Sequence, residues 1–166
     1  DIASDNQNPE RKDFSDVILS GRLRTAIQNI NPNLPSIAVE EAIRKVLLFD
    51  VTNPVLQNKR CHQYVTEGVD IEYQTDDGTR ADNVKLIDFE NPENNEFAVI
   101  NQFTIIENKN NRRPDLIVYV NGLPLSVIEL KNISDPNTDI WDAYNQIQTY
   151  KKEVPSIFNY NAVVVI

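Results

Sequence analysis

Three side chains with the chemistry of a hydrolytic metal site fall within one short stretch of this sequence. The run RPDLIVYVNGLPLSVIELK, residues 113–131, contains Asp115, Glu129 and Lys131. Carboxylates supply the hard oxygen ligands that Mg²⁺ prefers, and a bound divalent cation stabilises charge on a phosphoryl group and lowers the pKa of an attacking water. A nearby lysine can orient that water or stabilise the charged phosphate. The stretch therefore predicts a Mg²⁺-dependent site that hydrolyses a phosphodiester.

Strand parity decides whether these side chains can meet. Glu129 and Lys131 are two apart in an expected strand, so both point to one face. A two-residue turn at Asn121 and Gly122 would set Asp115 on the opposite face, whereas a three-residue loop or a β-bulge brings it opposite Glu129, with Cβ atoms about 5 Å apart. Two carboxylates this close repel, so at least one pKa rises unless a cation lies between them. The site requires an odd loop or a bulge.

The same residues form the pattern of a nuclease superfamily. The PD and ELK that contain them resemble the PD-(D/E)xK nucleases. Residues 91–152 resemble the N-terminal nuclease domain of the R subunit, the DNA-translocating restriction subunit, of type I restriction-modification enzymes. NPENNEFAVINQF, RPDLIVYVNGLPLSVIELKN and QIQTY carry this likeness. The resemblance implies catalytic roles for Asp115, Glu129 and Lys131, and metal ligation by Asp115, Glu129 and the Leu130 carbonyl. The alternative is an exposed hairpin with a surface Asp and a Glu/Lys pair.

Two further candidates lie on the helix expected after the hairpin. Gln146 and Tyr150 are four residues apart and therefore share one helix face. Taken alone they describe an ordinary polar face with a half-buried tyrosine. The resemblance implies more, because RecB-like and type I nucleases place a QxxxY motif beside the active site. Its implied role is contact with the DNA backbone or with the catalytic residues.

The resemblance also implies an acid from the first core helix, since many members of the superfamily contribute one. Glu40 is the candidate metal ligand. At about 100° per residue it falls beside the apolar stripe of residues 39–46, whereas Glu41 points nearly away. Simple solvation of Glu40 is the alternative.

Hydrophobic patterning predicts an α/β fold with a mixed β-sheet, an antiparallel meander plus a final strand, flanked by helices. The resemblance implies that this is a restriction-endonuclease-like core. Helices are expected over residues 14–30, over 36–50, and from a cap at Asp135 or Asn137 to residue 153. Strands are expected at residues 69–73, 84–89, 97–106, 114–120, 125–131 and 162–166.

Length and composition fit one domain. The chain has 166 residues, of which 40% are hydrophobic, enough for a sizeable core. Residues 1–12 are polar and aperiodic and predict a flexible N-terminal arm, leaving residues 13–166 as the nuclease domain. The end of the chain, NAVVVI, falls within an expected core strand, so we expect a fragment of a larger subunit. No GxxxxGK[ST] phosphate loop occurs, so ATP is expected only in motor domains outside this chain.

A net charge of −9 limits the partners that the domain can hold by itself. Sequence-independent DNA affinity comes from Lys and Arg neutralising phosphates, so an acidic domain is expected to bind DNA poorly alone. Arg112 and Arg113 precede the hairpin and can contact phosphate, or form a solvated loop. The single Cys61, the absence of a signal-peptide pattern and the shortness of the apolar runs predict a cytoplasmic protein without membrane contact.

Three functions remain open at this point. The resemblance implies Mg²⁺-dependent endonucleolytic cleavage of double-stranded DNA, as the nuclease domain of an ATP-dependent type I enzyme with specificity and methylation subunits as partners. A RecB-like or junction-cleaving repair nuclease would use the same residues. A nuclease-fold scaffold that has lost catalysis is the third possibility. The presence of all three expected catalytic residues argues against this last reading.

Overall fold

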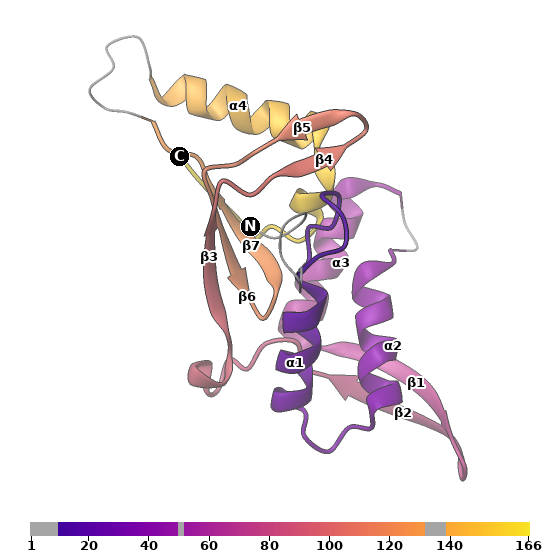
Figure 1. Ribbon diagram of the computed structural model, residues 1–166. Helices are drawn as coiled ribbons and strands as arrows, with labels where there is room; N and C mark the ends of the chain where they lie inside the picture. The colour runs from indigo at the N-terminus through magenta and orange to yellow at the C-terminus, as the bar shows by residue number, and fades with distance from the viewer. Residues whose placement is uncertain (1–9, 50–51, 132–138) are drawn as a thin grey trace.

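A computed structural model describes residues 10–49, 52–131 and 139–166 as an α/β fold (Figure 1). The helices are α1 (Ser20–Ile30), α2 (Ser36–Leu47), α3 (Pro54–Glu67) and α4 (Ile140–Glu153), with short 3₁₀ turns η1 (Pro92–Asn94) and η2 (Pro155–Asn159). The strands are β1 (Val69–Thr75), β2 (Gly78–Val84), β3 (Phe97–Asn101), β4 (Ile105–Glu107), β5 (Asn110–Arg112), β6 (Leu116–Val120), β7 (Leu123–Ile128) and β8 (Val163–Val165).

The central sheet is mixed, as the sequence predicted. Its strand order is β3-β6-β7-β8; β3, β6 and β7 are antiparallel, and β8 runs parallel to β7. The predicted single meander is wrong in one respect, because β1 with β2 and β4 with β5 form separate two-stranded hairpins. The α/β arrangement is compatible with a restriction-endonuclease-like core.

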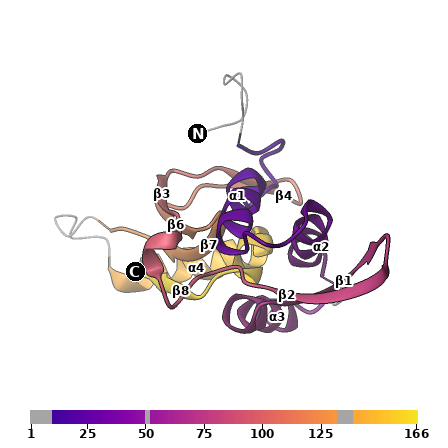
Figure 2. The same cartoon turned by 90° about the horizontal axis from the view of Figure 1, so that it is seen from below.

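One buried apolar cluster joins the helices to the strands. It includes Leu23 of α1, Val39 of α2, Ile71 of β1 and Ile117 of β6, each at most 1% exposed. Figure 2 shows α1 beside the central sheet, with α2 and then the β1–β2 hairpin farther out. The helical stripe that predicted α2 therefore faces this core, and its predicted end at residue 50 shortens to Leu47.

The first helix begins later than predicted, because the residues before it are held by the hairpin. The backbone N–H of Leu19 donates to Gly122 O at 3.0 Å, and the Tyr119 hydroxyl donates to Val17 O at 3.1 Å. These bonds tie residues 17–19 to the hairpin, and α1 starts after them at Ser20. Of the predicted flexible arm, residues 1–9 lie outside the described residues, whereas Arg11 is buried with its guanidinium 3.8 Å from the centre of the ring of Phe103.

Helix α3 was missed by sequence reasoning. The Asn53 side chain accepts hydrogen bonds from the backbone N–H groups of Val55 and Leu56 and caps this helix, which begins at Pro54. Proline is well tolerated at the first helical position. Only Cys61 of this helix is buried, so the sequence carries almost no apolar stripe to reveal it.

Other boundary errors have local causes. Thr75 pairs with Gly78 across a tight turn, so β2 runs over Gly78–Val84. The strand predicted over residues 84–89 therefore lies too late in the sequence, because β2 already ends at Val84. The strand predicted over residues 97–106 is divided into β3 and β4, with Gln102 at a φ of 53° between them. Helix α4 is capped by Asp139. The caps predicted at residues 135 and 137 lie outside the described residues.

The turn between β6 and β7 is packed directly against the start of α1. Asn121 and Gly122 both have positive φ, 52° and 78°, as a two-residue hairpin turn that matches strand twist requires. A Cβ atom on Gly122 would lie 2.5 Å from Leu19 O and 2.8 Å from the backbone nitrogen of Leu23. Only glycine fits here, so the turn fixes the hairpin against the helix.

None of the helices in residues 10–49, 52–131 and 139–166 combines the length and apolar character needed to cross a membrane.

We predict that Gly122→Ala destabilises the fold by about 3 kcal/mol, because it adds both the left-handed backbone strain of an L-residue and a clash with α1. Gly21→Ala is the matched control. Gly21 lies in α1 with no atom within 4 Å of an added Cβ, so the control should stabilise the fold by up to about 1 kcal/mol. Denaturant unfolding measures both changes, and equal effects would contradict the packing of the turn against α1.

Candidate active site

A β-bulge sets the register of the hairpin. Val120 pairs with Leu123, so the turn has two residues and the three-residue loop is not the solution. The register then shifts, because Tyr119 pairs with Pro124 while Val118 pairs with Ser126. The single residue left over on β7 is the extra residue of a bulge, which reverses the side-chain parity of everything beyond it. The predicted requirement for an odd loop or a bulge is confirmed by the bulge.

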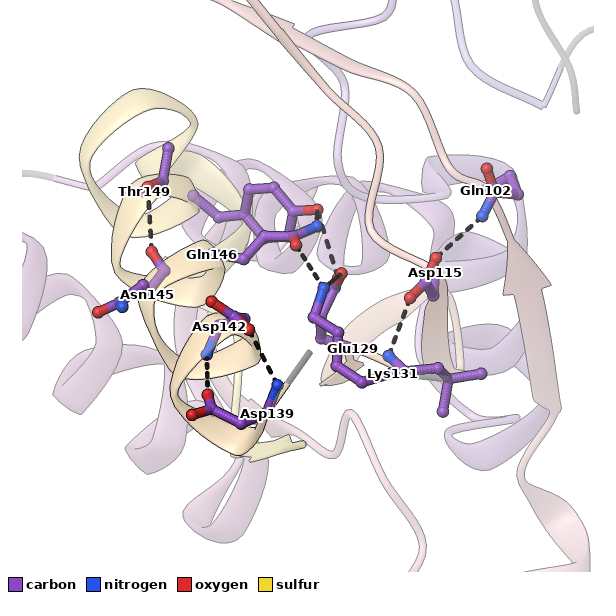
Figure 3. Close-up of polar contacts among 11 residues, drawn as sticks. Gln102, Asp115, Glu129, Lys131, Asp139, Asp142, Asn145, Gln146 and Thr149 are labelled. Carbon is purple, nitrogen blue, oxygen red and sulfur yellow. Dashed lines mark hydrogen bonds and ion pairs between the residues drawn. The ribbon is translucent and has the colours of Figure 1, made fainter. Parts of the chain in front are cut away.

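The corrected parity brings the two carboxylates to one side of the sheet. Leu116 pairs with Ile128, so the next position outward sets Asp115 level with Glu129. Asp115 Oδ2 also accepts a hydrogen bond of 2.8 Å from the backbone N–H of Leu130. Figure 3 shows Asp115 next to the strand end that bears Glu129 and Lys131.

Asp115 is held from the neighbouring strand by Gln102. The Gln102 side-chain amide donates to Asp115 Oδ1 at 3.1 Å, and its backbone N–H donates to Asp115 O at 2.9 Å (Figure 3). Sequence reasoning missed Gln102 as a site residue. Gln102 follows β3 with a left-handed backbone conformation, which few non-glycine residues adopt. No pattern in the sequence predicts this conformation.

Glu129 is the buried acid of the group, with 2% of its surface exposed. Its Oε1 accepts a hydrogen bond of 3.2 Å from Lys131 Nζ, and its Oε2 accepts one of 3.3 Å from the Tyr150 hydroxyl. Burial raises the pKa of Glu129 above its usual range, and the negative charge of Asp115 adds to the rise, while Lys131 and Tyr150 oppose it. A cation between the two acids would remove this conflict.

Gln146 and Tyr150 close a ring of hydrogen bonds around this acid. Lys131 Nζ donates to Gln146 Oε1 at 2.6 Å, and Gln146 Nε2 donates to the Tyr150 hydroxyl oxygen at 2.6 Å. The labelled Gln146 points from α4 towards Glu129 and Lys131 in Figure 3. The prediction that Gln146 and Tyr150 face the hairpin is confirmed. Burial, followed by the Glu129 charge, raises the pKa of Tyr150, so its hydroxyl stays protonated and donates to Glu129.

Helix α4 presents these two residues because its own pattern orients it. Asp139 and Asp142 form a reciprocal capping box at its start. The buried positions Ala143, Ile147 and Tyr150 recur at helical spacing and face the core. The face next to this stripe therefore carries Gln146 to the edge of the hairpin.

The structure does not bring Glu40 into this group, which corrects the predicted third acid. Its two carboxylate oxygens bind Arg24 of α1 at 2.5 Å and 2.9 Å, and its side chain is 53% exposed. The Arg24 hydrogen bond lowers the pKa of Glu40. Glu41 is paired with Arg44 in the same way. Both acids belong to the surface where α2 packs against α1 and β1, so α2 supplies no side chain to the hairpin site.

The group offers few protein ligands to a metal ion. Among the residues the structure describes, no three Asp, Glu, His or Cys side chains are grouped so as to hold a metal ion. Mg²⁺ commonly takes one or two carboxylates and completes its shell with water and substrate phosphate. Asp115, Glu129 and the backbone carbonyl of the exposed Leu130 offer such hard oxygen ligands.

The domain is a mixed α/β fold compatible with a restriction-endonuclease-like core, and its hairpin carries the PD-(D/E)xK residue pattern. The family described as "Type I restriction enzyme R protein N terminus" matches residues 1–166. The chain belongs to this family.

Individual relatives agree with the family. The type I restriction enzyme HindI endonuclease subunit of Haemophilus influenzae is 38% identical over 157 residues, 94% of this chain and 15% of that protein. The putative type I restriction enzyme MjaIXP endonuclease subunit of Methanocaldococcus jannaschii is 35% identical over 160 residues, 95% of this chain and 15% of that protein. The EcoprrI endonuclease subunit of Escherichia coli is 39% identical over 99 residues, 57% of this chain and 30% of that sequence. The chain thus spans about 15% of the first two relatives.

We predict that Glu129→Gln raises the stability of the metal-free domain near neutral pH. Because the pKa of Glu129 is raised on folding, its ionisation costs stability as the pH rises through the folded value, and the cost is absent below the ordinary value of 4.5. A glutamine accepts from Lys131 and donates to Tyr150 without ionising. The thermal midpoint should therefore rise by at least about 2 °C at about pH 8, and the difference from wild type should shrink at about pH 4. A destabilised variant at both pH values would contradict this account.

Proposed function

We propose that this domain is the Mg²⁺-dependent nuclease of a type I restriction enzyme R subunit and hydrolyses phosphodiester bonds in double-stranded DNA. The observation that carries the proposal is the bulge that sets Asp115 level with Glu129, beside the Lys131, Gln146 and Tyr150 ring. Membership of the R protein family supports the same reading. Hydrolysis consumes one water and converts a phosphodiester into a phosphate monoester and a hydroxyl.

The residues that would hold the metal are Asp115, Glu129 and the Leu130 carbonyl. When bound, Mg²⁺ supplies positive charge to the phosphate and acidifies a coordinated water. The raised pKa of Glu129 supports this assignment, because burial and the neighbouring Asp115 leave a buried negative site that a cation would stabilise. Gln102 holds Asp115 in place by its side-chain amide.

Lys131 is the residue proposed to meet the reacting phosphate or the attacking water. Its ammonium has three donors, of which one goes to Glu129 and one to Gln146. The third has no partner among the described residues, and we propose that it meets the ligand. Gln146 keeps the ammonium in place, and Tyr150 holds the Glu129 carboxylate by donating to Oε2. We assign Gln146 and Tyr150 to positioning these groups.

Other parts of the larger protein are proposed to deliver the DNA. The chain spans about 15% of the HindI and MjaIXP subunits and carries a net charge of −9, which is unfavourable for DNA binding by this domain alone. We propose that ATP-driven motor domains and the specificity and methylation subunits hold the DNA, in the cytoplasm. A free-standing RecB-like nuclease would need a cationic surface of its own, so the charge and the family both favour the type I reading.

We predict that Lys131→Ala in the full-length subunit, assembled with its partners, reduces Mg²⁺-dependent DNA cleavage by at least about 100-fold. ATP hydrolysis should remain near wild type, because the hydrogen bonds of the Lys131 side chain within the described part of the chain go to Glu129 and Gln146 of the candidate site. Plasmid linearisation and phosphate release measure the two activities. Normal cleavage by this variant, together with normal cleavage by Asp115→Asn, would identify the domain as a scaffold whose hairpin takes no part in cutting.

A second prediction tests whether the Tyr150 hydroxyl of the QxxxY motif positions Glu129. Tyr150→Phe removes the hydroxyl that donates to Glu129 and accepts from Gln146, but keeps the buried ring. Cleavage should fall by about 10- to 100-fold, the range typical of residues that position metal ligands, and the apparent Mg²⁺ requirement should rise. Tyr160→Phe is the control, since that hydroxyl is also buried but donates to Val46 O away from the hairpin. Equal losses in both variants would count against a role in positioning Glu129.

A further inference from the structure

Arg113, directly before the PD of the hairpin, differs from the other arginines in its contacts. Its side chain is exposed, and it makes no hydrogen bond, ion pair or ring contact with any described residue. The remaining arginines all have partners. Those bound to carboxylates are Arg22, Arg24, Arg44, Arg80 and Arg112. In a chain with a net charge of −9, an arginine beside the site that has no carboxylate partner among the described residues is available to a ligand.

The backbone holds this arginine firmly at the site. Arg112 is the last residue of β5, and Pro114, which is buried, follows Arg113. A residue before proline favours extended backbone, which limits the positions that the Arg113 backbone can take. Arg112 and Arg113 both border α4. Arg112 pairs there with Glu153, whereas Arg113 has no such partner among the described residues.

Arg113 lies at a hollow that adjoins the hydrogen-bond ring of the active site. The hollow is lined by Asn111, Arg112, Arg113, Gln146, Thr149 and Tyr150. Its lining therefore includes both residues of the QxxxY motif and no carboxylate. The nearest acid of α4 on this side, Glu153, is already neutralised by Arg112. An anion in the hollow would meet a free guanidinium without facing an unpaired negative charge from its walls.

We propose that Arg113 binds a backbone phosphate of the DNA strand adjacent to the phosphate that is cut. This inference rests on the proposed nuclease function and adds the contact that places the strand. A guanidinium matches the two oxygens of a phosphate with two parallel hydrogen bonds. Phosphate contacts fix the register of a strand but read no bases, so Arg113 aligns the backbone with Asp115 and Glu129 without selecting a sequence.

The assignment separates two adjacent arginines that the sequence left equivalent. Arg112 is committed to Glu153 and holds β5 against α4, and its Nη1 also donates to Asn111 O at 3.1 Å. Arg113 has no such contact within residues 10–49, 52–131 and 139–166. Each substitution by glutamine removes one positive charge at nearly the same place, so Arg112→Gln controls for the general change in field.

The experiment compares Arg113→Gln, Arg112→Gln and Arg113→Lys in the full-length subunit with its partner subunits and ATP. Initial rates of duplex DNA cleavage are measured at several salt concentrations, and ATP turnover in the same samples reports folding and the motor. Each phosphate contact releases about 0.9 counterion, so loss of one contact makes cleavage less sensitive to salt. The cleavage rate of Arg113→Gln divided by the wild-type rate should be well below one at about 50 mM salt. This ratio should rise about threefold when the salt concentration reaches about 200 mM.

Arg113→Lys and Arg112→Gln separate the effect of charge from the effect of guanidinium geometry. Arg113→Lys keeps the charge but loses the two-pronged geometry, so its salt dependence should match wild type while its rate stays several-fold lower. For Arg112→Gln the ratio to wild type should be the same at all salt concentrations, whatever its size. ATP turnover should be unchanged by all three.

A constant ratio for Arg113→Gln across the salt series would overturn the assignment. An equal salt effect from Arg112→Gln would overturn it as well, because the effect would then belong to the net charge. Failure of this inference is distinct from failure of the proposed function. If Lys131→Ala abolishes cleavage while Arg113→Gln behaves as wild type, the nuclease assignment stands and only the phosphate contact is refuted.

Discussion

The alternation of side chains along a β-strand is the constraint on which the candidate site depends. With a two-residue turn and regular pairing, Asp115 would point away from Glu129 and the chain would have no common site for the two acids. The bulge in β7 reverses the parity between the turn and the strand ends. It allows a tight turn at Gly122, which packs on α1, to coexist with the convergence of Asp115, just before β6, and Glu129, just after β7.

Burial of Glu129 is the main unfavourable interaction that the fold accepts at this place. Its carboxylate is removed from water, lies near another acid and is supported by Lys131 and Tyr150. Such a partly compensated charge lowers the stability of the fold. It also attracts a cation more strongly than an exposed carboxylate does, because electrostatic interactions are stronger in a poorly hydrated environment than in water. The α4 side chains Gln146 and Tyr150 complete its shell. The hairpin and α4 must therefore both form before the Glu129 carboxylate has all of its hydrogen-bond partners.

Charge is distributed so that most arginines stabilise the domain internally. Arg24 joins α1 to α2 through Glu40, and Arg112 joins β5 to α4 through Glu153. These pairs are partly exposed and each contributes modestly, but they occupy cations that would otherwise attract nucleic acid. Together with the net charge of −9, this pairing leaves few arginines to bind nucleic acid, which fits the proposal that other parts of a larger assembly deliver the DNA.

The sequence by itself determined the residue types of the site, the mixed sheet and the helix that carries Gln146, because hydrophobic period and residue spacing are local properties. It also determined that an irregular hairpin was required, since parity can be counted. Tertiary structure decided that a bulge supplies it, that Gln102 supports Asp115, and that Glu40 pairs with Arg24 instead of joining the site. Those outcomes depend on which elements pack together and on backbone conformations stabilised by distant contacts. Spacing along one chain does not encode either.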